Sequence, residues 1–362
     1  MSLRDLRRQA GRCVIAGFAG HTVPDDLRKL VAEFDLAGVI FFARNIVEPR
    51  QVAELSRESA ALAREWPLWV SVDQEGGRVA RLKAPFTEWP PAVTLGRSRD
   101  DALAERFAAA LAAELRAVGI NLDFAPVLDV HTNPANPVIG DRALADEPEL
   151  AARLGAAVIR GLQKSGVAAC GKHFPGHGDT HIDSHEAMPI VEHDRRRLEA
   201  IEFVPFKRAI AEDVATIMTA HVLVPAVDEE NVASFSKPVV TGILKEHLGF
   251  RGVVVSDDLD MKAVSSTTDN TEATIRAIQA GCDVVLLCNT TPDAQWQAIE
   301  ALIRAVERGV ISQTRIDDAF KRQRQVKERF AASFHAGPMV PALDLVGHAS
   351  HHAIAKEMST WR

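Results

Sequence analysis

Eight short apolar runs recur at near-regular intervals along the chain, and they constrain its fold more than any other feature. Each run is rich in β-branched or aromatic residues, and its apolar character is nearly continuous. Such runs are typical of strands that are buried on both faces of a parallel sheet. The predicted strands cover residues 13–19, 38–43, 69–73, 122–127, 167–173, 215–222, 252–257 and 283–288.

Amphipathic helical patterns separate these runs. They are predicted over residues 25–35, 48–65, 99–118, 147–165, 195–212, 237–248, 271–280, 293–308 and 314–330. Eight strand–helix units in about 300 residues predict a single-domain (β/α)8 TIM barrel of the α/β class, over residues 1–335. A doubly wound open sheet is the alternative, but no glycine-rich dinucleotide fingerprint follows the first run. Residues 336–362 are predicted to form a tail, with a loop and a short helix near residues 351–358.

The composition argues against several classes of protein. The 362 residues carry a net charge of −7 and no basic block, so nucleic acid is not expected as a partner. No apolar run approaches the roughly 18–20 residues of a membrane span, and the N-terminus does not resemble a signal peptide. We therefore expect a cytoplasmic protein without a membrane partner. The four cysteines lie in apolar runs without metal-binding spacing and are expected to be reduced thiols.

Polar side chains gather where five consecutive predicted strands end. In a barrel of this kind the active site forms at the carboxyl ends of the strands. The residues at these ends are Asp73, Glu75, Arg78, Asp129, His131, Asn133, Arg142, Lys172, His173, Thr219, His221, Ser256, Asp257 and Asp258. Each residue alone has an ordinary explanation, such as a helix cap, but together they predict a catalytic rim.

The segment 172–185, which follows the fifth run, holds four histidines and two aspartates within fourteen residues. Its proline and glycines exclude a regular helix and predict a loop. Histidines at every fourth position would suit a metal site on a helix. In an extended chain, Asp183 and His185 would instead point the same way and form a carboxylate–histidine acid/base pair. The acid/base pair is the preferred interpretation, and a polar loop without chemistry is the third.

Asp257 is the carboxylate of greatest interest. It follows four apolar or small residues and a serine, so it is expected at the lip of a buried strand. A carboxylate there can act as a nucleophile or stabilise a cation. Asp73, Arg142 and Lys172 are suited to bind hydroxyl groups or an amide, which indicates a carbohydrate site.

Five motifs closely resemble those of the glycoside hydrolase family 3 β-N-acetylglucosaminidases of the NagZ type. The resemblance runs from about residue 13 to residue 332, and the long histidine loop is its most specific part. The motifs are Lys172-His173-Phe174-Pro175-Gly176-His177-Gly178-Asp179-Thr180 with Asp183-Ser184-His185, Asp73-Gln74-Glu75-Gly76-Gly77-Arg78-Val79, Asn136-Pro137-Val138-Ile139-Gly140-Asp141-Arg142, Met218-Thr219-Ala220-His221 and Ser256-Asp257-Asp258-Leu259.

The resemblance implies a retaining enzyme that hydrolyses terminal, non-reducing β-linked N-acetylglucosamine. It implies that Asp257 is the nucleophile and that His185, paired with Asp183, is the general acid/base. The sugar-binding residues that it implies are Asp73, Arg142, Lys172 and His173, with Asp129 and His221 as neighbours. The implied small-molecule substrates are N-acetylglucosaminyl-1,6-anhydro-N-acetylmuramic acid and its peptides, from peptidoglycan recycling. A monomer without metal or cofactor is expected.

Two positions depart from the family pattern. Glu186 and the residues after it replace a more apolar stretch, and Asp260 stands where a small residue is usual. Asp260 is expected to raise the pKa of Asp257 if both face the pocket. Three alternative functions stay open: a phosphorylase on the same scaffold, a metal-dependent hydrolase using His173, His177, Asp179 and Asp257, and a sugar-binding protein without catalysis.

Overall fold

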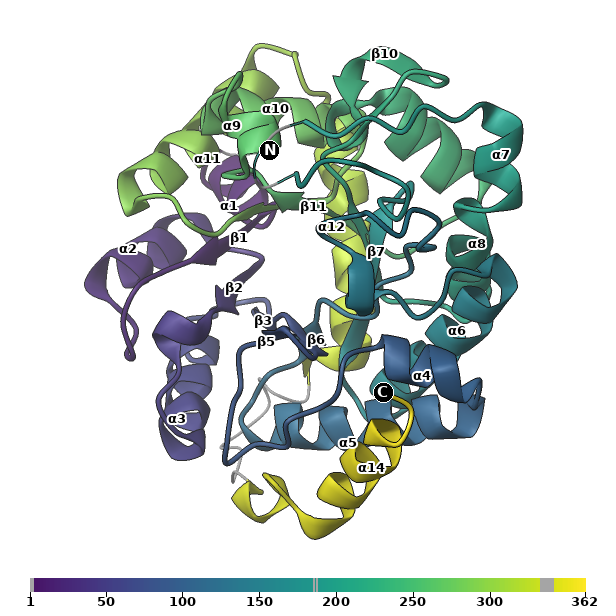
Figure 1. The fold of residues 1–362 in the computed structure, drawn as a ribbon. Coiled ribbons are helices and arrows are strands. Elements are labelled where there is room, and N and C mark those ends of the chain that lie inside the picture. The colour runs from purple at the N-terminus through teal and green to yellow at the C-terminus, as the bar shows by residue number, and fades with distance from the viewer. Residues whose placement is uncertain (1–2, 185, 187, 333–341) are drawn as a thin grey trace.

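The computed structural model describes residues 3–184, 186, 188–332 and 342–362, and it confirms the predicted barrel (Figure 1). Eight parallel strands pair in chain order and close on themselves. They are β1 (Val14–Gly17), β2 (Gly38–Phe41), β3 (Trp69–Val72), β6 (Leu122–Asp123), β7 (Ala168–Phe174), β8 (Thr216–Thr219), β11 (Val253–Asp258) and β12 (Val284–Leu287). Each predicted strand is present, although its ends differ by up to a few residues.

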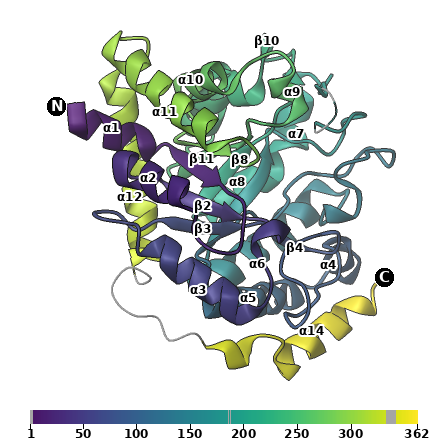
Figure 2. The same ribbon diagram turned by 90° about the vertical axis from the view of Figure 1, so that its left-hand side faces the viewer.

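Helices cover the outside of the barrel (Figures 1 and 2). They are α1 (Leu3–Gly11), α2 (Asp25–Phe34), α3 (Pro49–Ala60), α4 (Val93–Ser98), α5 (Asp101–Ala117), α6 (Pro148–Lys164), α7 (Arg195–Ala200), α8 (Phe203–Ala211), α9 (Lys262–Ser265), α10 (Asn270–Ala280), α11 (Pro292–Glu307), α12 (Gln313–Phe330) and α14 (Ala349–Ser359). Proline in the first turn begins α3, α6 and α11, where its missing N–H costs no helical hydrogen bond.

Several shorter elements complete the chain. They are the hairpins β4 (Gln74–Gly76) with β5 (Val79–Ala80) and β9 (Leu223–Val224) with β10 (Asp228–Val232), the 3₁₀ turns η1 (Ala43–Asn45), η2 (Gly140–Arg142), η3 (Ala233–Phe235) and η5 (Leu343–Leu345), and the π-helix η4 (Pro238–His247). The first hairpin carries part of the polar rim.

The prediction of one helix over residues 195–212 is wrong. The chain forms two helices there, α7 and α8, which are separated at Ile201 and Glu202. Pro205 explains the break, because it has no N–H to donate to the carbonyl of Ile201. The N-terminal helix α1, whose residues are mostly polar, was not predicted.

Two apolar layers hold the barrel together. One lies between the strands and the outer helices, and the other fills the barrel interior. Helix α12 lies behind the strands in the view of Figure 1. Its residues Val326 and Phe330 belong to the interior layer. Lys327 is buried on the same helix, and its Nζ donates to the carbonyl oxygen of Ala37 at 2.7 Å.

A helix also occupies the region where the tail was predicted to form one. Figure 2 shows α14 along the outside of the barrel, next to α5. The Nδ1 of His351 on α14 lies 2.8 Å from Oε1 of Glu114 on α5, and both side chains are buried. All four cysteines are buried free thiols, as expected. No helix in the described part of the chain has the length and apolar character of a membrane span.

Candidate active site

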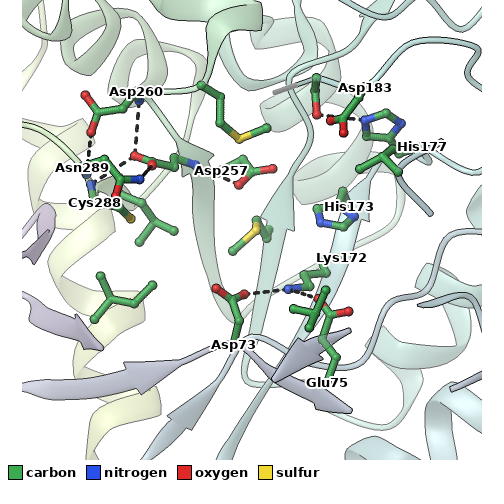
Figure 3. A pocket seen from close by; sticks show the side chains of 18 of the residues that line it. Asp73, Glu75, Lys172, His173, His177, Asp183, Asp257, Asp260, Cys288 and Asn289 are labelled. Carbon is green, nitrogen blue, oxygen red and sulfur yellow. Dashed lines mark hydrogen bonds and ion pairs between the residues drawn. The ribbon is translucent and has the colours of Figure 1, made fainter. Parts of the chain in front are cut away.

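A cavity of about 420 Å³ opens at the carboxyl end of the barrel (Figure 3). Its polar lining comes from the ends of β3, β7, β11 and β12 and the loops that follow them, and from the loop after β6, which supplies Arg142. The charged and polar residues that line it are Asp73, Glu75, Arg78, Arg81, Arg142, Lys172, His173, His177, Asp183, Ser184, Asp257, Asp258, Asp260, Lys262 and Asn289. Part of the predicted rim therefore forms one site, whereas six of the predicted rim residues do not line the cavity: Asp129, His131, Asn133, Thr219, His221 and Ser256.

Two cations and two carboxylates alternate along one wall of the cavity. Lys172 at the end of β7 lies 2.9 Å from Oδ1 of Asp73 and 2.7 Å from Oε1 of Glu75. Arg142 at the end of η2 donates to both oxygens of Glu75, at 2.9 and 2.8 Å. Asp73, Arg142 and Lys172 were predicted to bind sugar. Glu75 was predicted only as a residue of the rim, and the structure shows that it bridges Lys172 and Arg142.

The ion pairs set the charge state of this wall against the effect of burial. Burial acts to raise the pKa of Glu75, but Lys172 and Arg142 outweigh it and hold that pKa far below its ordinary value. Burial likewise acts to lower the pKa of Lys172, and Asp73 and Glu75 raise it instead. Glu75, Lys172 and Arg142 are therefore ionised at neutral pH. Fixed charged donors and acceptors of this kind discriminate strongly in favour of a substrate rich in hydroxyl groups.

Asp129 organises the end of β7 from behind the cavity. Its carboxylate lies 2.7 Å from Nδ1 of His173 and accepts the N–H groups of His173 and His177. Burial acts to raise the pKa of Asp129, but the two histidines hold it below its ordinary value. Asp129 is fully buried and is not among the lining residues, whereas His173 is. The structure thus places Asp129 beneath His173.

His177 connects the histidine loop internally. Its Nδ1 lies 2.6 Å from Oγ1 of Thr180, and its Nε2 lies 3.1 Å from Oγ of Ser184. Burial lowers the pKa of His177 to about 4, so the ring is neutral at neutral pH. Both ring nitrogens are engaged within the loop, which places Ser184 and the preceding Asp183 at the cavity.

Asp257 lies at the lip of β11, as predicted, and points into the cavity (Figure 3). Its Oδ1 accepts the N–H of Asp258 at 2.9 Å. Burial, followed by the charge of Asp260, raises the pKa of Asp258 to about 7. Asp260 therefore acts on Asp258, and its predicted effect on the pKa of Asp257 stays a prediction. Asp260 also accepts from Asn270 and from the N–H of Asn289.

His221 lies behind β11. Its Nε2 is 3.0 Å from the carbonyl oxygen of Asp258, and its Nδ1 is 2.8 Å from Oγ of Ser234. The ring is fully buried and is not among the residues that line the cavity. His221 therefore supports the strand end that carries Asp257.

The structure brings Asp257, Asp183 and the sugar-binding candidates together, but it does not settle the acid/base pair. Asp183 lines the cavity on the side facing β11 (Figure 3). His185 lies outside the described residues, so its pairing with Asp183 stays a prediction.

The residues of the metal hypothesis do not converge in the described part of the chain. Asp179 turns away from His177 and contacts Thr132 and His193. Among the described residues, no group of three or more His, Cys, Asp or Glu side chains is arranged to hold a metal ion. Freedom from metal and cofactor remains a prediction that dialysis can test.

A carboxylate at the lip of a barrel strand, beside a wall of fixed charges that suits hydroxyl groups, is typical of the glycoside hydrolase class. The profile of the glycosyl hydrolase family 3 N terminal domain matches residues 9–326. The chain therefore belongs to glycoside hydrolase family 3, as its motifs indicated.

Known proteins resemble the chain over most of its length. Beta-hexosaminidase A of Pseudoalteromonas piscicida is 33% identical over 93% of this chain, which spans 60% of that longer protein. A family 3 β-N-acetylglucosaminidase from Paenibacillus sp. is 43% identical with a TM-score of 0.94, covering 100% of this chain and 69% of that one. NagZ from Neisseria gonorrhoeae, solved with N-trifluoroacetyl-D-glucosamine, is 32% identical with a TM-score of 0.78, covering 96% of this chain and 97% of that one.

Proposed function

We propose that the protein is a retaining exo-β-N-acetylglucosaminidase, which removes terminal, non-reducing β-linked N-acetylglucosamine. One observation carries this proposal: Asp257 shares a single cavity with Asp183 and with the charged wall around Lys172 and Glu75. A nucleophile, a group that can orient an acid/base, and fixed hydroxyl-binding groups are what a retaining glycosidase needs.

The cavity also suits an N-acetyl group. Ile40, Met218 and Leu286 line it together with the charged residues. These side chains come from the barrel interior and offer an apolar surface to a methyl group, while the charged wall binds the ring hydroxyls. We propose that Asp73, Arg142, Lys172 and His173 contact the sugar, and that Asp129 and His221 hold the contacting residues in place.

In the proposed mechanism, the Asp257 carboxylate attacks C1 of the sugar and forms a glycosyl ester as the bond to the leaving oxygen breaks. His185, protonated and oriented by Asp183, gives its proton to that oxygen. Neutral His185 then takes a proton from water, whose oxygen attacks C1 and releases Asp257. An imidazole with an ordinary pKa near 6.5 serves both steps at neutral pH.

We further propose that the substrates are N-acetylglucosaminyl-1,6-anhydro-N-acetylmuramic acid and its peptides, and that a cytoplasmic monomer cleaves them during peptidoglycan recycling. The likeness to NagZ from Neisseria gonorrhoeae over nearly the full length of both chains supports this choice. The size of the cavity supports an exo mode of cleavage, since a volume of about 420 Å³ suits a single sugar residue better than a long chain.

Product analysis tests the proposal directly. The enzyme is incubated with N-acetylglucosaminyl-1,6-anhydro-N-acetylmuramic acid, with and without inorganic phosphate, and proton NMR follows the anomer that forms first. We expect β-N-acetylglucosamine at a rate that does not depend on phosphate. N-acetylglucosamine 1-phosphate would identify a phosphorylase, an initial α-anomer would exclude retention, and binding without cleavage would leave a sugar-binding protein.

A further inference from the structure

The loop after β7 is tied together at its neck by a cluster of side chains outside the cavity. We call this cluster the neck cluster: Asp179, His193 and Thr132. Oδ1 of Asp179 accepts from the hydroxyl of Thr132 at 2.5 Å, and Oδ2 of Asp179 lies within hydrogen-bond distance of Nε2 of His193. Arg197 approaches the same carboxylate, with Nη2 3.6 Å from Oδ1.

The neck cluster joins three parts of the chain. Asp179 stands where the loop leaves the barrel, His193 follows the point where the loop returns, and Thr132 belongs to the loop after β6. The backbone is also held close here, because a side chain at Gly178 would come within 1.9 Å of the carbonyl oxygen of Val130. The outgoing end of the segment that carries Asp183 is therefore fixed to the neighbouring loop through Thr132, and its returning end is fixed to the outgoing end through His193.

The charges around the cluster favour an ionised Asp179. Burial acts to raise the pKa of Asp179, but the hydrogen bonds from Thr132 and His193 lower it. Arg197 also pairs with the buried Glu202, at 3.4 Å, which keeps this cation beside the neck. Hydrogen bonds to an ionised carboxylate are among the stronger ones in proteins.

None of the three residues of the neck cluster lines the cavity. Their effect on catalysis can only pass through the segment that they hold. That segment brings Asp183 and Ser184 to the cavity wall, where the amide N–H of Ala263 donates to the carbonyl oxygen of Ser184 at 3.1 Å. A loosened neck would leave Asp257 and the charged wall intact, because these belong to other elements.

We propose that Asp179, His193 and Thr132 are positioning residues for proton donation, acting through Asp183 on the acid/base. This inference rests on the proposed function. Its signature is selective: cleavage of a substrate whose leaving group needs a proton depends on the neck cluster, and cleavage of a substrate with a good leaving group does not.

The test compares kcat/KM for 2,4-dinitrophenyl and phenyl N-acetyl-β-D-glucosaminide, because kcat/KM reports the first chemical step for both. The variants are Asp179→Ala, His193→Ala and His193→Gln, whose amide N–H can take the place of Nε2–H. The matched control is His247→Ala, which breaks a surface pair of the same kind, with Nε2 of His247 2.9 Å from Glu199. The ratio of the two kcat/KM values does not change if part of a variant is unfolded.

We expect Asp179→Ala and His193→Ala to lower kcat/KM for the phenyl glycoside about tenfold to a hundredfold and that for the dinitrophenyl glycoside less than about threefold. His193→Gln should restore most of the ratio, and His247→Ala should match the wild type. An unchanged ratio in both alanine variants overturns the inference while the proposed function stands. A wild type that cleaves neither glycoside overturns both.

Discussion

Replacing Lys327 by methionine should make the protein more stable. Lys327 is 2% exposed beneath the barrel, and its Nζ lies 5.7 Å from the centre of the Trp69 ring. Burial lowers the pKa of this amine from its ordinary value of 10.5 to about 7. The carbonyl of Ala37 would stay hydrogen-bonded in the variant, because it also accepts the N–H of Trp69 at 3.0 Å. Methionine is similar in length and carries no charge.

The magnitude follows from the two pKa values. At pH 6 the amine is charged in both the folded and the unfolded state. The difference between its ordinary pKa of 10.5 and its folded pKa of about 7 corresponds to a destabilisation of the folded state by about 5 kcal/mol. The lost hydrogen bond offsets about 1 kcal/mol of the gain. The folded state binds fewer protons than the unfolded state between pH 7 and 10.5, so this group makes the wild type more stable as pH rises through that window. The advantage of Lys327→Met should therefore be about 4 kcal/mol at pH 6 and fall by about 2–3 kcal/mol by pH 9.

Urea denaturation of wild type and Lys327→Met at pH 6 and pH 9 measures this effect. The matched control is Lys321→Met, which removes an exposed amine from the same helix. It should change the free energy of unfolding by less than about 0.5 kcal/mol at either pH. The reasoning is refuted if Lys327→Met is less stable than the wild type at pH 6, or if its advantage does not shrink at pH 9.

Three further predictions concern the cavity. Glu75→Gln should cost about 3 kcal/mol of stability and lower kcat/KM, because Lys172 and Arg142 lose a buried counter-charge; urea denaturation and steady-state kinetics measure both effects. Asp258, with a folded pKa of about 7 against an ordinary 3.8, makes stability fall as pH rises between these values. Asp260→Asn should lower the pKa of Asp258 and so reduce the loss of stability between pH 5 and pH 7.5. Denaturation at these two pH values measures the change. Dialysis against a chelator should leave activity unchanged, and lost activity that zinc restores would revive the metal hypothesis.

The fold was predictable because the apolar runs report burial directly. A strand covered on both faces of a parallel barrel needs a continuous apolar run, and eight such runs admit few architectures. The break between α7 and α8 was missed because the amphipathic pattern continues across it, although Pro205 supplied the signal. Helix α1 was missed because its mostly polar sequence obscures the apolar pattern.

The location of the site was predictable, but the contacts that individual residues make within it were less predictable. Parallel strands bring their carboxyl ends to one rim, so Asp73, Lys172 and Asp257 had to be neighbours. Which carboxylate would bridge Lys172 and Arg142 depends on how the β4–β5 hairpin directs its side chains. Gly76-Gly77 marks the turn of this hairpin but does not report the direction of Glu75. The regular spacing of the histidines was also misleading. It suggested a metal site, but the ring of His177 contacts Ser184 within the loop.

The most direct test of the account is hydrolysis of p-nitrophenyl N-acetyl-β-D-glucosaminide by the wild type, Asp257→Ala and His185→Ala. The account predicts that Asp257→Ala has no turnover. It predicts that His185→Ala releases a rapid burst of nitrophenol, because this leaving group needs little protonation, and then turns over slowly as the glycosyl ester accumulates. An active Asp257→Ala, or a His185→Ala variant with wild-type turnover, would contradict the assignment of the nucleophile or of the acid/base.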